Sequence, residues 1–430
     1  MALNRYEGKT LLILGGLAGM AELTRKAQAQ GAKVVVTDNV PTSPAKRVAD
    51  ESYAISITDV DDIVELAQRI GVDGVMVGHS EFVLPYYVEV CEKLGLPCYG
   101  TMRSFDLMSN KAHFKEACIK NSVPTIQEYT YDEAKAAGES IYPLIVKPVD
   151  SAGSRGITFC HSVDEIDAAV EKALSFSPSK KYIIEKFMTA PEVVIYYYFQ
   201  DGVPIFAGMC DRYTNNEQDG VAQLPTSYVF PSLHTADFVQ SDRSNYRRFF
   251  EDVGIVNGPL FLQAFIGDDG LPRVYEAGFR LNGAREHYIF TGIGEPSVHD
   301  MLINFAFTGK MWEGDLSQDF DPFLDGKFGC KLSPLIRPGV ISKITGLDEA
   351  MELPSVKQII LNNDIGDVVA DNNVGQLKQI AYRAFIVDDS VAELKTSIDR
   401  VANLIDYQDG AGKSMMLTPF DTNLLWAYER

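Results

Sequence analysis

The sequence predicts an α/β unit with a parallel sheet, followed by two α+β units whose strands are antiparallel. Two observations carry this expectation. Over residues 1–105, apolar strand-like runs alternate with helical stretches, which is typical of parallel sheets covered by helices on both faces. After residue 105 the strand-like runs follow one another closely and are rich in Tyr and Phe, which favours antiparallel sheets.

The first unit, residues 1–105, is predicted as a domain of alternating strands and helices. Its buried strands are short apolar runs, and a glycine turn at 15–19 follows the first of them. The predicted elements are a strand at 11–14, a helix at 20–30, a strand at 33–37, a helix at 59–70, a strand at 74–77 and a helix at 82–94.

The second unit is expected over 106–325 and the third over 326–430, with residues from about 122 to 190 forming a separate subdomain. The second unit should begin with a helix at 106–120 and contain strands at 143–149, 181–185, 192–200, 203–209, 260–266 and 272–277. The third should contain strands near 335–344, 358–362 and 380–387, and a final helix at 388–405.

Composition excludes some classes of partner. The chain carries 59 Asp and Glu against 39 Lys and Arg, a formal net charge of −20. Such a surface repels phosphate backbones and anionic lipids, so we expect no nucleic-acid and no membrane partner. No window approaches the run of about 18 apolar residues that spans a bilayer. The polar residues before Leu11 lack the apolar core of a signal peptide, so we expect a cytoplasmic protein.

An apolar strand that ends in Lys147 and runs into a small-residue loop is the first segment with chemical meaning. A lysine fixed on a strand is suited to phosphate oxygens. The loop offers Ser151, Gly153, Ser154 and Gly156, whose small side chains let backbone N–H groups approach phosphates. The alternative is a lysine that extends from a core strand beside an ordinary loop.

A second segment places acidic residues within an apolar strand. Glu185 precedes Lys186, Phe187 and Met188, and Glu192 opens the next apolar run. Buried acids require polar partners. The backbone N–H and C=O groups of Lys186 and Met188 offer an edge for adenine, and Glu192 can accept hydrogen bonds from ribose hydroxyls. The alternative is an edge strand with surface acids.

The third segment is a predicted hairpin. Alternation along its second strand puts Glu276, Gly278, Arg280 and Asn282 on one face, and Gln263 is expected opposite them on the first strand. Oxygen ligands on paired strands suit Mg²⁺ shared with phosphates. An arginine beside them can stabilise a phosphoryl group during transfer.

In this order the three segments resemble the ATP-grasp superfamily, and Lys111 looks like the family's first ATP-binding lysine. The stretch 337–347 is similar to the last domain of L-amino-acid ligases and of biotin-carboxylase-like enzymes. The resemblance implies a pre-grasp domain, a two-part ATP-grasp domain whose lid is the subdomain near 122–190, and a C-terminal biotin-carboxylase-like lobe. It also implies that ATP and Mg²⁺, or Mn²⁺, are cofactors. A carboxylate would become an acyl phosphate that an amine attacks.

The sequence departs from the family at its metal-binding motif. The usual pattern is Glu-x-Asn-x-Arg, whereas this chain reads Glu276-Ala-Gly278-Phe-Arg280, and Gln263 stands where many members have Glu. Glu276 and Gln263 remain the expected metal ligands. A water molecule or Asn282 is the alternative to the missing Asn, and a protein that binds nucleotide without turnover is the alternative to an active ligase.

Three functions follow as hypotheses. The first is an ATP-dependent ligase that joins a small carboxylate, such as an amino acid, to an amine and releases ADP and phosphate. Arg280 would stabilise the moving γ-phosphate, and Arg285 would clamp the substrate carboxylate or else pair with Glu286 or another acid. The second is a carboxyphosphate-forming enzyme that uses bicarbonate, like carbamoyl phosphate synthetase. The third is a degenerate nucleotide-binding protein. A homodimer is compatible with each.

Overall fold

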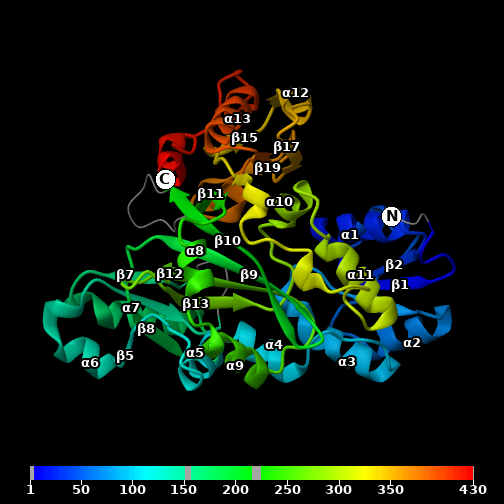
Figure 1. Cartoon of the computed structure of the whole chain (residues 1–430), viewed down its shortest axis with the longest axis horizontal. Coiled ribbons are helices and arrows are strands. Elements are labelled where there is room, and N and C mark those ends of the chain that lie inside the picture. The colour runs from blue at the N-terminus through cyan, green and yellow to red at the C-terminus, as the bar shows by residue number, and fades with distance from the viewer. Residues whose placement is uncertain (1–3, 151–155, 216–223, 430) are drawn as a thin grey trace.

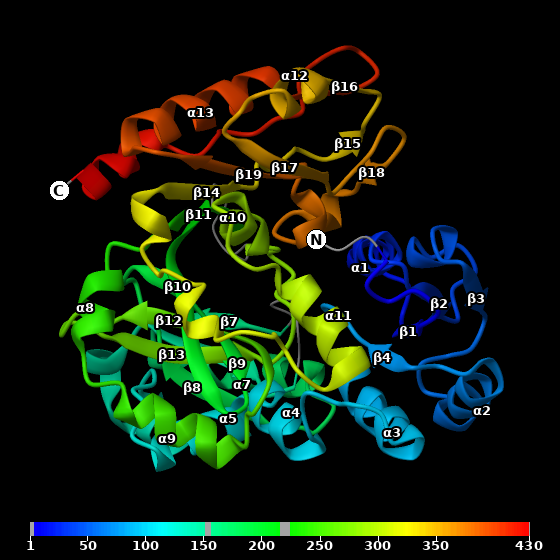
Figure 2. The same cartoon turned by 45° about the vertical axis from the view of Figure 1, so that its right-hand side comes forward.

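The computed structural model describes residues 4–150, 156–215 and 224–429. The N-terminal domain lies beside the central domain, and the C-terminal lobe lies above both (Figures 1 and 2). Among the described residues, no helix is long and apolar enough to cross a membrane.

The N-terminal domain has the predicted parallel sheet, in the strand order β3-β2-β1-β4. β1 is fully buried, because helices cover a parallel sheet on both faces. The elements are β1 (Thr10–Leu14), α1 (Ala18–Ala29), β2 (Lys33–Thr37), β3 (Glu51–Tyr53), α2 (Val60–Ile70), β4 (Gly74–Met76) and α3 (Leu84–Leu94).

The single helix predicted over 106–120 is wrong, because the chain breaks it into α4 (Met102–Ser109) and α5 (Lys111–Lys120). Asn110 is the break: its backbone is extended, and its side-chain oxygen accepts hydrogen bonds from the N–H groups of Ala112 and His113. An Asn in this position caps the helix that follows. The cap puts Lys111 at the first position of α5.

The lid region contains a separate antiparallel sheet with the order β5-β8-β6-β7. It packs around its own small core, which includes Leu144, Val146, Ile166 and Ile184. The elements are β5 (Glu128–Tyr129), α6 (Tyr131–Ala136), β6 (Leu144–Pro148), β7 (Thr158–Cys160), α7 (Ile166–Phe176) and β8 (Tyr182–Lys186).

A second antiparallel sheet has the order β13-β12-β9-β10-β11-β14-β19-β17 and continues from the central domain into the C-terminal lobe (Figure 2). Its first part confirms the predicted hairpin, in which Gln263 of β12 lies opposite Glu276 of β13. The central elements are β9 (Glu192–Gln200), β10 (Val203–Asn215), β11 (Leu224–Phe230), α8 (Thr235–Gln240), α9 (Ser244–Val253), β12 (Gly258–Ile266), β13 (Pro272–Gly278), α10 (His287–Gly292) and α11 (Val298–Thr308).

The C-terminal lobe extends this sheet through β14, a strand that the sequence analysis missed, which pairs with β11 on one side and β19 on the other. The predicted strand near 335–344 is replaced by two short strands, β15 and β16. The elements are β14 (Phe328–Leu332), β15 (Gly339–Val340), β16 (Lys343–Thr345), α12 (Leu347–Met351), β17 (Val356–Leu361), β18 (Val368–Val369), β19 (Tyr382–Asp388), α13 (Val391–Leu404) and β20 (Asp406–Gln408).

Candidate active site

Three charged side chains meet inside the cleft-facing part of the lid sheet. Lys147 of β6 and Lys115 of α5 each place Nζ 2.6 Å from a different oxygen of Glu185, which lies on β8. The Glu185 side chain is only 2% exposed. Lys115 also reaches Glu128 at 3.2 Å. The structure therefore brings together the predicted Lys147 and Glu185 and adds Lys115.

The charges of this triad are tightly coupled. Burial raises the pKa of Glu185, but the ion pairs with Lys147 and Lys115 outweigh burial and hold the pKa below its usual value. Glu185 is therefore an anion with one lysine on each oxygen. The three side chains together carry one net positive charge, which Glu128 beside Lys115 partly offsets.

Lys115 was missed because the sequence analysis stopped at the family's first lysine. A signal was present: Lys115 lies four residues after Lys111 in a helix, so both side chains are on the same face. A lysine on the buried side of a helix requires a partner, and the buried Glu185 supplies it.

A cavity of about 290 Å³ lies next to the triad, between α4, α5, β13 and the end of β6. Lys111 and Glu276, both predicted site residues, line it together. Asp150 closes one side just before residues 151–155, so the predicted contacts of Ser151, Gly153 and Ser154 lie outside the described residues. Glu81 from the N-terminal domain is also in the wall.

Gly156 ends the loop with a left-handed φ of 80°, and a Cβ there would come within 2.7 Å of Phe176. The position therefore requires glycine both for its backbone and for its close contact with α7.

The predicted adenine edge is partly occupied by the protein. The Lys186 N–H donates to the carbonyl oxygen of Gln127 at 2.9 Å, so this N–H is not available for a base. Phe187 donates its N–H to Pro143 O at 3.1 Å and packs its ring against Phe159. The contact expected from the Met188 backbone stays a prediction.

Glu192 and Gln263 meet at the hydroxyl of Tyr275. That hydroxyl hydrogen-bonds to Glu192 and lies 2.7 Å from Oε1 of Gln263. Glu192 also forms an ion pair with Arg212. Glu192, predicted to bind ribose, and Gln263, predicted to bind the metal, thus both bond to other protein groups. Gln263 is not among the residues that line the cavity with Glu276.

Packing against Phe261 explains why residue 278 is Gly and not the Asn that is usual in the family. Gly278 faces Phe261 across the hairpin, and a Cβ on residue 278 would come within 2.2 Å of the Phe261 ring. The aromatic ring therefore fills the space of the missing side chain. The centre of the Phe261 ring lies 5.2 Å from Cζ of Arg280, which is a cation–π contact.

The strand ends at Gly278, so the predicted alternation does not continue to Arg280 and Asn282. Arg280 donates to Glu81 Oε1 from Nε at 3.2 Å and from Nη2 at 2.9 Å, which links the central domain to the N-terminal one. Asn282 accepts from the Ala284 N–H at 2.9 Å through its side chain, and it lines a second, smaller cavity with Arg280. Asn282 is not among the residues that line the cavity of Glu276.

Arg285 has a left-handed φ of 60° and lies 3.5 Å from Glu22 of α1. Its ion pair is thus with an acid of the N-terminal domain and not with Glu286. Burial raises the pKa of Glu286 to about 8, so this neighbouring carboxyl is held largely neutral near pH 7.

Two further cations near Arg285 were not predicted. Lys331 of β14 is 2% exposed, and its Nζ lies 3.7 Å from the centre of the Tyr228 ring. Arg383 of β19 donates from Nη1 to Asn362 at 2.6 Å, while its Nε is buried without a partner. Burial and then Arg285 lower the pKa of Arg383 to about 10. Within the described ranges, neither Lys331 nor Arg383 has a carboxylate within ion-pair distance.

Comparison with known proteins agrees with this architecture. Residues 117–201 match the family model described as the C-terminus of D-Ala–D-Ala ligase. The phosphoribosylamine–glycine ligase of Pasteurella multocida is 23% identical over 358 residues, which cover 78% of this chain and 81% of that protein. The same enzyme of Caulobacter vibrioides is 29% identical over 164 residues, and that match spans 36% of this chain and only 38% of the relative.

Solved structures share the fold over almost the whole chain. An L-amino acid ligase from Bacillus licheniformis has a TM-score of 0.74 at 18% identity and covers 94% of this chain and 99% of its own. The biotin carboxylase domain of the Hydrogenobacter thermophilus 2-oxoglutarate carboxylase, solved with MgADP and bicarbonate, has a TM-score of 0.72 at 17% identity and covers 97% and 92%. The chain therefore shares the fold of these ATP-dependent enzymes over almost its whole length.

Proposed function

We propose that this protein is an ATP-dependent ligase that activates a small carboxylate as an acyl phosphate and joins it to an amine, with release of ADP and phosphate. The observation that carries the proposal is the buried triad of Lys115, Glu185 and Lys147 beside the cavity lined by Lys111 and Glu276. Phosphoryl transfer depends on positioning and charge stabilisation, and this arrangement supplies both.

The residues of the cavity fit ATP and a divalent cation. Lys147 and Lys115 present positive charge at the end of β6, and Glu276 with Asp150 presents carboxylate oxygens, the ligands that Mg²⁺ prefers. Bound Mg²⁺, or Mn²⁺, would supply charge neutralisation between the phosphates. Lys111, Lys115 and Lys147 would hold the phosphate oxygens, and Glu276 would hold the cation.

The acceptor carboxylate would bind on the side of Arg280 opposite the nucleotide cavity. Arg285, which pairs with Glu22, would meet it together with Lys331 of β14 and Arg383 of β19. Burial lowers the pKa of both Lys331 and Arg383, and an incoming carboxylate would give these two groups an anionic partner. Arg280, which bridges to Glu81, lies between the two parts of the site and would stabilise the phosphoryl group in transit. The L-amino acid ligase among the structural neighbours supports an amino acid as the carboxylate.

Two other functions remain candidates. The likeness to a biotin carboxylase domain solved with bicarbonate favours carboxyphosphate formation. Gly278, with Phe261 filling the place of an Asn ligand, favours a protein that binds nucleotide without turnover. In each case we propose small-molecule partners, no nucleic acid, no membrane, a cytoplasmic location and, as an open possibility for assembly, a homodimer.

The test is phosphate release from ATP and Mg²⁺ in a screen of amino-acid and amine pairs, with and without bicarbonate. We expect release that depends on an amino acid, and a strong loss of activity in Lys147→Ala, because one charge-assisted phosphate contact contributes about 1.5–3 kcal/mol. Lys181→Ala, an exposed lysine of the same lid, is the matched control. A strict need for bicarbonate would favour the second function. Nucleotide binding without turnover under all conditions would favour the third.

A further inference from the structure

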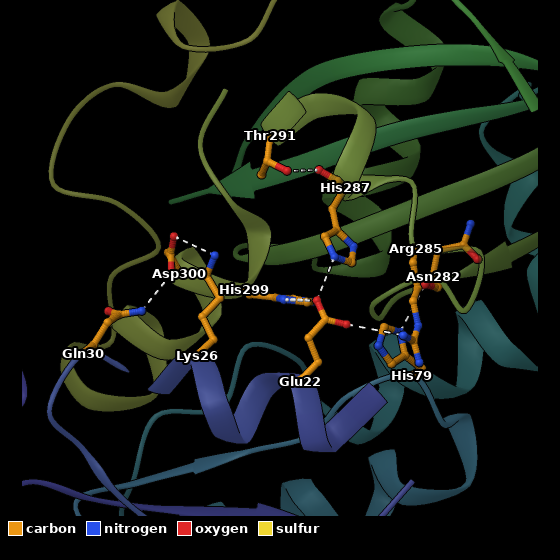
Figure 3. A network of polar contacts seen from close by, with 10 residues as sticks. All are labelled: Glu22, Lys26, Gln30, His79, Asn282, Arg285, His287, Thr291, His299 and Asp300. Atoms are coloured by element: carbon orange, nitrogen blue, oxygen red, sulfur yellow. Dashed lines mark hydrogen bonds and ion pairs between the residues drawn. The ribbon is translucent and has the colours of Figure 1, made fainter. Parts of the chain in front are cut away.

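A buried group of metal-ligating side chains lies between the N-terminal and central domains, apart from the nucleotide cavity. Glu22 of α1 extends toward His287 at the start of α10 and His299 of α11 (Figure 3). One atom from each of the three side chains lies within 4.8 Å of the others. The imidazoles are buried, with His287 4% and His299 1% exposed.

The distances within this group fit a shared cation better than hydrogen bonds. Oε1 of Glu22 lies 3.3 Å from Nε2 of His287 and 3.3 Å from Nδ1 of His299. The His287 contact is within hydrogen-bond distance, but most N–H···O hydrogen bonds are shorter, about 2.7–3.2 Å. Nitrogen and oxygen ligands at about 2.1 Å from a tetrahedral ion stand about 3.4 Å apart. The spacing in this protein therefore matches two edges of a tetrahedral ligand set.

The charged groups around these three side chains are also arranged as they are around a metal site. The second oxygen of Glu22 pairs with Arg285 at 3.5 Å, as a ligating carboxylate is commonly held by an outer partner. Lys26, the other nearby cation, is neutralised by Asp300 at 3.3 Å.

Polar atoms in the group also lack protein partners. Nε2 of His299, the ring nitrogen opposite the one that faces Glu22, and Nε2 of His79 are both buried without a hydrogen bond in the described structure. The ring of His79 lies 6.5 Å from that of His299. Gly19, on the same helix as Glu22, allows this approach, because a Cβ there would come within 2.3 Å of the His79 ring. The chain thus places a third imidazole beside the group.

We infer that Glu22, His287 and His299 form a binding site for a first-row divalent transition metal, of which Zn²⁺ is the best match. Two imidazoles and one carboxylate are a recurring zinc ligand set and leave one position for water or a further ligand. The ion would join α1 to α10 and α11 and so fix the N-terminal domain against the central one. This site is separate from the cation site at Glu276 and does not depend on the proposed ligase activity.

The test is metal stoichiometry in the untagged full-length protein. The protein is stripped with a chelator, incubated with Zn²⁺, dialysed and measured by elemental analysis. We expect one tightly held Zn²⁺ per chain, an increase of Tm on adding Zn²⁺, and loss of both effects in Glu22→Gln and His299→Asn. The controls are His161→Asn, an exposed histidine, Cys98→Ser and Glu276→Gln, all of which should keep the Zn²⁺.

Co²⁺ added to the wild-type protein gives a readout that needs no variant. We expect the intense visible absorption of four-coordinate Co²⁺, displaced by one equivalent of Zn²⁺. The inference is overturned if the wild-type protein retains no Zn²⁺ after dialysis, if Co²⁺ gives only the weak spectrum of the hydrated ion, or if folded Glu22→Gln binds Zn²⁺ as tightly as wild type. In those cases the group is a hydrogen-bond network that joins the two domains.

Discussion

The proposed nucleotide side and the proposed acceptor side of the site each bury a glutamate, and the pKa values of the two glutamates are shifted in opposite directions. Glu185 has a lysine 2.6 Å from each oxygen, and its pKa is lowered. Glu286 has a buried Oε2 without a partner, and its pKa is raised to about 8. The nucleotide side is therefore a paired arrangement of fixed charges. The proposed acceptor side combines a neutral acid with two basic groups, Lys331 and Arg383, whose pKa values are lowered mainly by burial, and an incoming anion would stabilise their charged forms.

Removing the charge of Glu185 should give the largest change in the free energy of unfolding. Glu185→Gln leaves the buried Lys147 without a counter-ion and Lys115 with only the more exposed Glu128, which costs about 3–5 kcal/mol of the free energy of unfolding. Denaturant unfolding at pH 7 measures it. Glu128→Gln removes the other, 41% exposed partner of Lys115 and should cost less than about 1 kcal/mol. Equal losses in the two variants would mean that the triad is not a coupled unit.

The hairpin that carries Glu276 offers a second test, because Gly278 can be replaced by the Asn that is usual in the family. Gly278→Asn forces a side chain into the Phe261 ring, and such overpacking costs up to about 3 kcal/mol. Gly283→Asn is the control, since a Cβ there has open space around it. If Gly278→Asn is as stable as wild type, then Phe261 does not hold the place of the missing ligand.

Glu286→Gln should raise the free energy of unfolding, whereas Glu185→Gln should lower it. The folded pKa of about 8 lies above the ordinary value of 4.5, mainly because of burial, so wild-type stability falls as pH rises between these values. The variant should match wild type near pH 4.5 and exceed it by about 4 kcal/mol at pH 8. Thermal unfolding across pH measures the gap, with exposed Glu251→Gln as the flat control. A gap that shrinks toward pH 8 would contradict the assignment.

The regular pattern of the chain made much of the fold predictable. The parallel sheet, the lid strands β6 and β8, and the hairpin at Gln263 and Glu276 follow from hydrophobic alternation and turn residues. The break at Asn110 was missed because the helical pattern continues across it and only the cap reveals it. β14 was missed because a short strand such as Phe328–Leu332 carries little periodicity of its own.

The site was predictable where residues are close in sequence and much less so where the fold brings distant segments together. Lys147 and the residues around Glu185 stand in recognisable segments, but the role of Lys115 depends on α5 packing against β8. The partners of Glu22 lie in α10 and α11, more than 260 residues further along the chain. No local pattern marks Lys331 or Arg383 as members of one cationic group, because β14 and β19 become neighbours only in the folded sheet.

Product analysis tests the central claim most directly. The protein is incubated with ATP, Mg²⁺ and an amino acid in the absence of an amine, and hydroxylamine is added to trap an acyl phosphate. The proposed ligase predicts ADP and phosphate as products together with a hydroxamate of the amino acid, and greatly reduced amounts of all three with Lys147→Ala. AMP and pyrophosphate as the stoichiometric products would contradict transfer of the γ-phosphate to the carboxylate and with it the proposed mechanism.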